Sequence, residues 1–307
     1  MKRPLTFWLC LTLLAACAPQ PAPRTPAPVT PTFSPPTASP APTDFPSPAP
    51  SATLAASATP AAPRFSLQRP IPGAIVERSY PYGSTQNGAR EAHHGVEFYQ
   101  PFGTPVLAAA AGRVVFAGED NLTLLAWVTD FYGNVIVLQH SLNGQTVFTL
   151  YAHLSKIDVQ AGQTVAVGQK IGAVGASGTA IGSHLHFEVR VGQNDYFSTR
   201  NPELWLAPLP GRGTLAGRIV DSAGNPLAGQ INLQRVENGI LNPLSVGQAQ
   251  TYVRERLNSD DLLGETFALG DLPAGDYRLS LVANSAVLEQ RVTIFAGTFT
   301  PVEFVVQ

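Results

Sequence analysis

Histidine residues are concentrated in one part of this 307-residue chain, because all six lie between positions 93 and 186. The densest segment is Ser183-His184-Leu-His186-Phe-Glu188-Val-Arg190. Successive side chains of a β-strand alternate between its faces, so His184, His186 and Glu188 would share one face. Two imidazoles about 6.6 Å apart along a strand can serve one metal centre, one as a ligand and the other acting on the bound water. A pair of surface histidines would give the same pattern.

A second segment, His93-His94-Gly95-Val96-Glu97, places an imidazole and a carboxylate four residues apart. In a straight strand these positions would be about 13 Å apart, too far to share an ion that binds each ligand at ~2.0–2.2 Å. We therefore expect Gly95 to help bend the chain. A third segment, Tyr151-Ala-His153, follows an expected strand and adds another imidazole. A set of two histidines and one carboxylate favours zinc with one open position.

Together, the three segments resemble the lysostaphin-type (LytM-like) zinc endopeptidases, which cut the peptides of peptidoglycan. That family reads His-x-Gly-x-Asp, then Tyr-x-His-Leu, then His-x-His-Phe-Glu, and the resemblance covers about residues 75–205. It implies one zinc ion per chain, with His93, Glu97 and His186 as its ligands. Peptidoglycan peptides are then the expected substrate.

The catalytic pair of that family falls on His153 and His184. Because His184 neighbours the expected ligand His186 on one strand, we expect it to act as general base on the zinc-bound water. His153 would then donate a hydrogen bond to the developing oxyanion, although the two roles could be exchanged. One position departs from the pattern, because Glu97 stands where the family has aspartate. Glutamate is a competent zinc ligand, so either the backbone has adjusted, or zinc binds weakly, or the site is degenerate. The alternative function is therefore a catalytically impaired module that binds the wall or activates other wall hydrolases.

Two further histidines lie outside this set. His94 fills a variable position between the expected ligands, and we expect it to face solvent. His140 closes an expected strand and is predicted to satisfy backbone groups at its end rather than bind metal. The stretch from Glu119 to Phe131 is interpreted as a loop inserted between strands, at the rim of a substrate groove.

The surrounding sequence predicts an all-β region over residues 65–209, the expected zinc endopeptidase domain. Short apolar alternations such as residues 112–118 and 134–140 are separated by glycines, without a helical apolar stripe. Two stretches, beginning at Gly103 and Gly162, echo one another. We therefore expect a two-half β-sandwich of the duplicated hybrid (LytM-like) type.

Residues 212–307 are interpreted as a second β-sandwich of Ig/transthyretin-like type. Turn signals such as Gly224-Asn-Pro separate short alternating stretches, and the whole resembles the carboxypeptidase-regulatory-like modules. Residues 237–264 are polar and weakly patterned, so a long loop is expected there. This part holds no histidine, and we expect it to be a spacer or binding module.

The N-terminus predicts export and a lipid anchor. A basic start precedes an apolar stretch from Leu5 to Ala16, which at about 18 Å is too short to cross a bilayer core. Leu14-Ala15-Ala16-Cys17 resembles the bacterial lipobox, which implies a signal peptide over residues 1–17 and acylation of Cys17. The alternative is an ordinary secretory signal in which this cysteine is incidental.

Residues 18–64 contain 15 of the 28 prolines and almost nothing to bury, so we expect a disordered, extended tether. The chain is then an extracytoplasmic, membrane-anchored lipoprotein. Its formal net charge is −2 and only 13% of its residues are charged. No basic stripe could follow a phosphate backbone, which excludes nucleic acid as an expected partner.

Overall fold

The computed structural model describes residues 65–252 and 257–307. The predicted signal peptide over residues 1–17 with Cys17, and the predicted tether over residues 18–64, lie outside the described residues. The described residues fall within one compact unit. In this part of the chain, no helix has the length and apolar character needed to cross a membrane.

Residues 65–209, here called the first region, fold into short strands and three single-turn 3-10 helices. In chain order the elements are β1 Val96–Tyr99, β2 Pro105–Leu107, β3 Gly112–Glu119, η1 Asp120–Leu122, β4 Asn134–Leu142, β5 Gln145–Ala152, β6 Leu154–Ile157, β7 Thr164–Val165, β8 Lys170–Val174, β9 His184–Val191, η2 Tyr196–Ser198, β10 Thr199–Arg200 and η3 Pro202–Leu204. The all-β prediction is confirmed.

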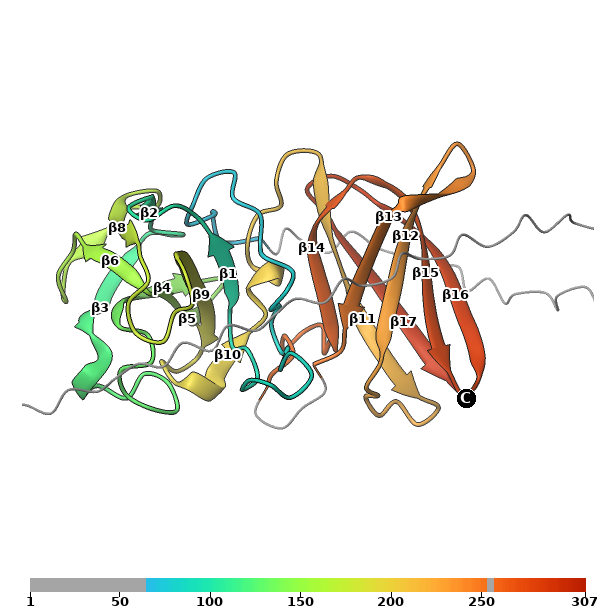
Figure 1. The fold of residues 1–307 in the computed structure, drawn as a ribbon, viewed down its shortest axis with the longest axis horizontal. Helices are drawn as coiled ribbons and strands as arrows, with labels where there is room; N and C mark the ends of the chain where they lie inside the picture. Colours follow the sequence, from blue (N-terminus) through green and yellow to red (C-terminus); the bar gives the residue numbers. More distant parts are fainter. Residues whose placement is uncertain (1–64, 253–256) are drawn as a thin grey trace, which may run out of the picture. The chain divides into compact units, whose positions relative to one another are not determined.

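The strands of the first region form two antiparallel sheets. The larger has seven strands in the order β1-β9-β5-β4-β3-β7, with β10 paired to β9 (Figure 1). The smaller has the order β2-β8-β6. The two similar stretches of sequence pair with each other in the structure. β2 and β3 follow Gly103, β7 and β8 follow Gly162, and β2 pairs with β8 while β3 pairs with β7. The two sheets have seven and three strands, and the expected similarity of two halves stays a prediction.

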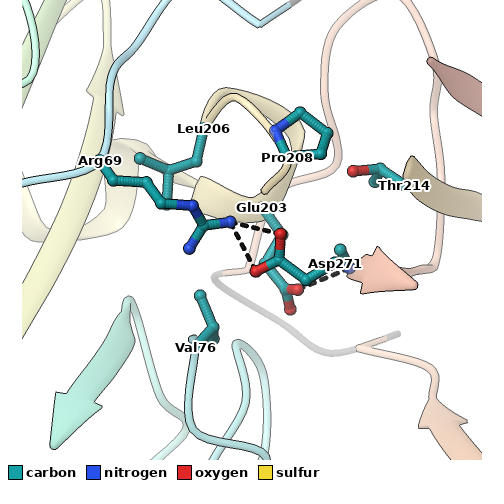
Figure 2. A pocket seen from close by; sticks show the side chains of 8 residues that line it. Arg69, Val76, Glu203, Leu206, Pro208, Thr214 and Asp271 are labelled. Atoms are coloured by element: carbon teal, nitrogen blue, oxygen red, sulfur yellow. Dashed lines mark hydrogen bonds and ion pairs between the residues drawn. The ribbon is translucent and has the colours of Figure 1, made fainter. Parts of the chain in front are cut away.

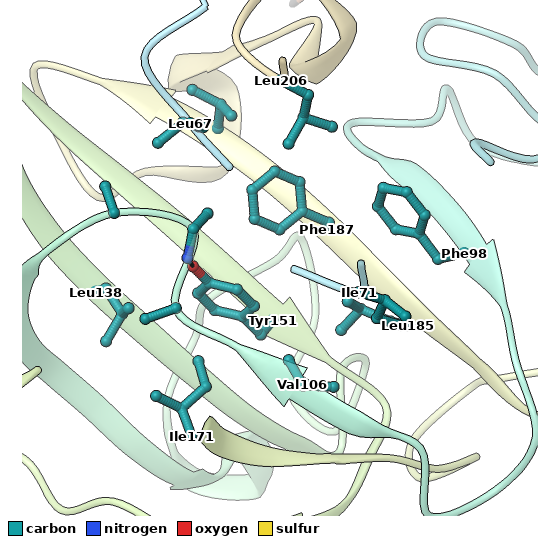
Figure 3. Packing of buried hydrophobic residues seen from close by; sticks show 14 of the residues in the cluster. Leu67, Ile71, Phe98, Val106, Leu138, Tyr151, Ile171, Leu185, Phe187 and Leu206 are labelled. Atoms are coloured by element: carbon teal, nitrogen blue, oxygen red, sulfur yellow. Dashed lines mark hydrogen bonds between the residues drawn. The ribbon is translucent and has the colours of Figure 1, made fainter. Parts of the chain in front are cut away.

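Strand β9 lies between β1 and β5 and has both of its faces covered. Leu185, Phe187 and Val189 point into the main hydrophobic core, where Figure 3 shows the first two packed beside Phe98 and Tyr151. The opposite face carries the polar residues from position 184 to 190, and these are buried as well. The alternation predicted for this segment is confirmed.

A second apolar cluster covers the polar face of β9. It combines Leu125 and Tyr132, from the segment between β3 and β4, with Phe148 of β5 and Tyr196 of η2. The expected inserted loop therefore reaches the face on which the histidines lie. Asp120 fixes this loop, because its carboxylate accepts hydrogen bonds from the backbone nitrogens at positions 131, 132 and 133.

Residues 212–307, here called the C-terminal region, form two further sheets. Their strands are β11 Arg212–Asp221, β12 Gln230–Glu237, β13 Ile240–Gln250, β14 Phe267–Pro273, β15 Gly275–Ala283, β16 Ala286–Ile294 and β17 Phe299–Val306. One sheet has the order β14-β11-β17 and the other β13-β12-β15-β16. A single apolar cluster draws on both sheets, including Leu215 and Phe267 from the first and Ile231 and Leu279 from the second.

The expected long loop over residues 237–264 is wrong in part, because β13 occupies residues 240–250. Among the described residues, β13 is an edge strand whose pairing partner is β12. Polar side chains such as Asn242 and Gln248 are tolerated on a strand with one exposed edge. The apolar alternation that would have revealed this strand in the sequence is therefore weak.

Candidate metal centre

Strand register brings together residues that are far apart in the sequence. Glu97 of β1 lies directly opposite His186 of β9, and Ala152, the last residue of β5, flanks His186 on the other side. His153 follows immediately after β5. The three predicted segments therefore meet at one place on the seven-stranded sheet.

Gly95 permits the close approach of β1 to β9. The chain bends at this residue, as expected from the sequence. A Cβ atom on Gly95 would lie 2.5 Å from the carbonyl oxygen of Phe187 and 2.8 Å from Cε1 of His186. Any larger residue would therefore collide with the β9 backbone and with an imidazole of the cluster.

His93, Glu97 and His186 form the group of described residues that could hold a metal ion. Nε2 of His93 lies 3.2 Å from Nδ1 of His186. Oε1 of Glu97 lies 3.1 Å from the first of these atoms and 3.3 Å from the second. Ligand atoms held at ~2.0–2.1 Å around a tetrahedral zinc ion are about 3.3 Å apart, so this triangle of nitrogen and oxygen atoms fits zinc.

The charges around His186 favour a cation. Its Nε2 lies 3.0 Å from Oε1 of Glu188, and because a carboxylate only accepts, this nitrogen donates. With a metal ion in place of the Nδ1 proton, the lone pair of Nδ1 would face His93 and Glu97. Although burial lowers it, the two neighbouring carboxylates raise the pKa of His186 to about 9. Burial raises the pKa of Glu97, but hydrogen bonds from His184, His186 and His93 hold it well below its usual range.

Glu188, Arg190 and Tyr132 support the ligand from behind, a role that the sequence did not reveal. Nε of Arg190 donates to Oε2 of Glu188 at 2.7 Å, and the Tyr132 hydroxyl donates to Oε1. Arg190 also donates to the Leu125 carbonyl at 2.8 Å. Burial raises the pKa of Glu188, but Arg190 and His186 outweigh it and lower that pKa to about 2. The carboxylate thus stays ionised and fixes the orientation of the His186 ring.

The two remaining predicted site residues lie beside this group. Nε2 of His184 is 2.7 Å from Oε2 of Glu97, and its Nδ1 is 3.1 Å from the carbonyl oxygen of Gly182. The ring of His153 lies 4.8 Å from that of His184 between centroids, and its Nδ1 is 2.9 Å from the carbonyl oxygen of Ser177. The backbone of His153 has a φ of +61°, an unusual conformation that turns the chain from β5 into β6.

The other two expectations about histidines differ in outcome. His94 does not face solvent as expected, because only 5% of it is exposed. Its Nδ1 lies 2.8 Å from Oγ1 of Thr199 and its ring stacks 4.0 Å from that of Tyr196, since the bend at Gly95 turns His94 inward. Nδ1 of His140 contacts a backbone carbonyl at 2.8 Å. This agrees with the prediction that His140 lies outside the set of His93, Glu97 and His186, here called the metal group.

Comparison with known proteins gives a consistent result for this part of the chain. Residues 91–198 match the family described as Peptidase family M23. The Peptidoglycan DD-endopeptidase ShyA of Vibrio cholerae is 41% identical over 99 residues, which is 32% of this chain and 20% of that protein. The Uncharacterized lipoprotein YgeR of Escherichia coli is 35% identical over 121 residues, or 39% and 41% of the two chains. The match thus spans about a fifth of ShyA and less than half of YgeR.

Among solved structures, the catalytic domain of the antimicrobial peptidase lysostaphin from Staphylococcus simulans is 34% identical. The match covers 42% of this chain and 89% of that domain, with a TM-score of 0.34. The family match at residues 91–198 includes His93, Glu97, His153, His184 and His186. Residues 91–198, with the metal-binding geometry that lies within them, thus match peptidase family M23.

Proposed function

We propose that this chain is a zinc-dependent endopeptidase that hydrolyses peptide bonds of peptidoglycan outside the cytoplasm. The observation that carries the proposal is the triangle of ligand atoms from His93, Glu97 and His186, with edges of 3.1 to 3.3 Å. The substrate class is supported by the name of ShyA, a peptidoglycan DD-endopeptidase of the matched family.

His93, Glu97 and His186 would hold the zinc ion, which when bound supplies an activated water and polarises the scissile carbonyl. The protein's own contribution is to fix these groups in a buried site. Glu97 and His186 are held by the pairing of β1 with β9, and Glu188 orients the His186 ring. Preorganised groups of this kind need no rearrangement as charge develops during the reaction.

The contacts of His153 and His184 favour the exchanged roles, with His153 as the general base and His184 as the donor to the oxyanion. Nδ1 of each ring faces a carbonyl oxygen, so Nδ1 donates and Nε2 faces the site. Nε2 of His184 lies beside the Glu97 carboxylate, which favours a proton on that nitrogen. Burial, together with the neighbouring His186 and His184, lowers the pKa of His153 to about 3, so that ring is neutral and its Nε2 accepts. His153 would orient the attacking water and accept its proton, while His184 donates to the oxyanion.

Hydrolysis of isolated cell walls tests this proposal. The full chain should release soluble dye-labelled fragments and new amino groups without new reducing sugar ends, because an endopeptidase breaks amide bonds and leaves glycosidic bonds intact. A chelator should stop the release and added zinc should restore it. His153→Ala and His184→Ala should retain zinc but lose about 10²–10³-fold in rate. His140→Ala is the matched control, since His140 lies in the same sheet outside the metal group, and it should keep most of the activity.

A second candidate function rests on Glu97, which replaces the aspartate of the lysostaphin-type pattern. A module with an impaired site could bind the wall or activate other wall hydrolases. If the zinc-loaded chain releases nothing from walls of several cross-link types, the endopeptidase proposal is wrong and this second function is favoured.

We also propose that acylated Cys17 anchors the protein to a membrane, with the proline-rich residues 18–64 as a tether. The sequence Leu14-Ala15-Ala16-Cys17 supports this, and YgeR, which matches part of this chain, is named a lipoprotein. Detergent phase partition and mass spectrometry of the protein made in a bacterium should show a lipid-modified N-terminal cysteine. An unmodified Cys17 or cleavage at another position would exclude the anchor.

A further inference from the structure

The C-terminal region contributes directly to the core of the first region. Ala216 of β11 is fully buried within the main hydrophobic cluster of the first region, and Leu263, Ala268 and Phe299 pack against that cluster. Tethered modules that move independently keep separate cores. Here the C-terminal region has its own core but also adds these four residues to the core of the first region.

Ion pairs also connect the two regions at this contact, here called the joint. Arg69 of the first region donates to both carboxylate oxygens of Asp271 at 2.5 Å, and the two side chains are only 8% and 2% exposed (Figure 2). Arg78 pairs with Glu203 and also donates to the Gly270 carbonyl at 2.6 Å. The backbone nitrogen of Gly270 in turn donates to Glu203 at 2.6 Å. Each charge is thus paired across or beside the joint, as buried charges require.

One path leads from this joint to the metal ligand His93. The backbone of His93 is hydrogen-bonded on both sides to the preceding loop, because its nitrogen donates to Ser84 and its carbonyl accepts from Gly83. Tyr252 of the C-terminal region presses on this loop. A Cβ atom on Gly83 would lie 2.2 Å from Cβ of Tyr252, so the two segments are in close contact. The edge of the Tyr252 ring also packs against Tyr82, with ring centroids 5.0 Å apart.

Tyr252 is itself held firmly. Its hydroxyl donates to Glu265 at 2.6 Å, and the same carboxylate accepts from the backbone nitrogen of Asp260 at 2.9 Å. Glu265 and Tyr252 are both buried. The ring therefore acts as a fixed support for the Gly83 loop.

A second path ends at His94, the neighbour of His93. Asn258 donates to the carbonyl oxygens of Phe197 and Thr199 at 2.6 and 3.1 Å. The Tyr82 hydroxyl donates to the carbonyl of Thr199, whose own hydroxyl bonds His94. Both sets of contacts thus end at the bend that places His93 beside Glu97 and His186.

We propose that the C-terminal region is a positioning element of the metal centre, in which Tyr252 and Asn258 hold the loop and the bend that orient His93. The region is then a structural part of the enzyme, in addition to any role in binding the wall. This inference rests on the proposed zinc site, but it concerns residues that touch neither the metal group nor the substrate.

Two readouts on the full chain test it. Tyr252→Ala removes the ring and should raise hydrogen exchange at backbone amides of residues 82–94 by at least tenfold. It should also weaken zinc binding about 10–100-fold, the usual cost of losing support behind a ligand. Tyr252→Phe keeps the ring against the loop and should restore both readouts to within about threefold of wild type. Tyr277→Ala is the matched control, because Tyr277 is an equally buried tyrosine of the C-terminal region whose hydroxyl bonds within that region.

If Tyr252→Ala leaves exchange at residues 82–94 unchanged, or if Tyr277→Ala raises it equally, the inference is wrong. Should Tyr252→Ala fail to fold, Asn258→Ala replaces it, since Asn258 is only partly buried, and faster exchange at residues 94 and 197–199 is then expected. Unchanged exchange in that variant would overturn the inference. Exchange does not depend on catalysis. An enzyme that binds zinc and responds to Tyr252→Ala but does not cut walls would contradict the proposed function alone.

Discussion

The two regions bury charge in different places. In the first region, histidines, Glu97, Glu188 and Arg190 lie buried around the polar face of β9. In the described part of the C-terminal region, the buried acidic residues are Glu265 and Asp271. Asp271 pairs with Arg69 of the first region, and Glu265 holds Tyr252, which contacts that region. Burying a charge is costly unless it is paired and hydrogen-bonded. Charge is therefore buried at the site or at the contact that supports the site.

The strands explain this difference. Burial in β16 largely alternates, with exposed residues between partly buried ones, because one face of its sheet meets water. Strand β9 is buried at seven of its eight positions, since the segment around Leu125 and Tyr132 covers its second face. Covering a polar face removes water from it, which strengthens every electrostatic interaction there. The covered second face of β9 therefore holds its polar side chains where charges interact strongly.

The largest expected effect comes from His186→Ala, which removes a ligand from the covered face. Zinc affinity should fall by more than about 100-fold, because the loss of residues that only support a ligand already costs 10–100-fold. Elemental analysis after dialysis measures this loss. His140→Ala should retain zinc, because His140 lies in the same sheet but bonds Ala111 and Thr149 instead of the metal ligands. Equal zinc content in the two variants would show that the ligand set is wrong.

Glu188→Gln compares a buried ion pair with an exposed one. It leaves the fully buried Arg190 without its charged partner, so the free energy of unfolding should fall by about 3–5 kcal/mol. Glu303→Gln breaks the exposed pair with Arg218 in the C-terminal region and should cost less than about 1 kcal/mol. Urea unfolding of both variants with a chelator present makes the comparison. Similar losses would mean that burial of the β9 face does not set the strength of its contacts.

A smaller effect concerns Glu265 at the joint. Burial raises the pKa of this carboxyl from 4.5 to about 7. Between these two pH values the folded state binds more protons than the unfolded state, so this group's contribution to stability declines as pH rises. Glu265→Gln should remove that decline. Relative to wild type, the variant should therefore gain up to about 3 kcal/mol between pH 4.5 and 8. If the free energies of unfolding of the variant and the wild type differ by the same amount at every pH in this range, the pKa of Glu265 is not raised.

The smallest expected effect is that of Glu97→Asp. Glu97 reaches the ligand triangle from a position fixed opposite His186 by strand register. The shorter aspartate should fall short, and zinc affinity should drop about tenfold, as for other disturbances of ligand geometry. Competition with a chromogenic chelator measures the change. A rise in affinity would instead indicate that the natural site is weakened, in favour of the activator function. Glu97→Gln is the control, and full zinc retention in it would mean that Glu97 is not a ligand.

Local spacing predicted the parts of this site that lie on one strand or one bend. The alternation of β9 separated His184 and His186 from the core side chains, and the glycine between His93 and Glu97 indicated the bend. Contacts between distant residues could not be predicted in this way. Tyr132 meets Glu188 across 56 positions of sequence, and no local pattern records such a pair. His94 was misplaced for the same reason, since its partner Thr199 is 105 positions away.

The order of assembly follows from the pairing of β11 with β17. These strands run parallel, with Thr214 opposite Phe299, so the chain must close a loop of about 85 residues before they can meet. Loops of that size close slowly, and long-range parallel pairing delays folding. Ala216 and Phe299, which complete the core beneath the metal centre, lie on these two strands. The centre is therefore expected to reach its final rigidity only late in folding, when the last strand docks.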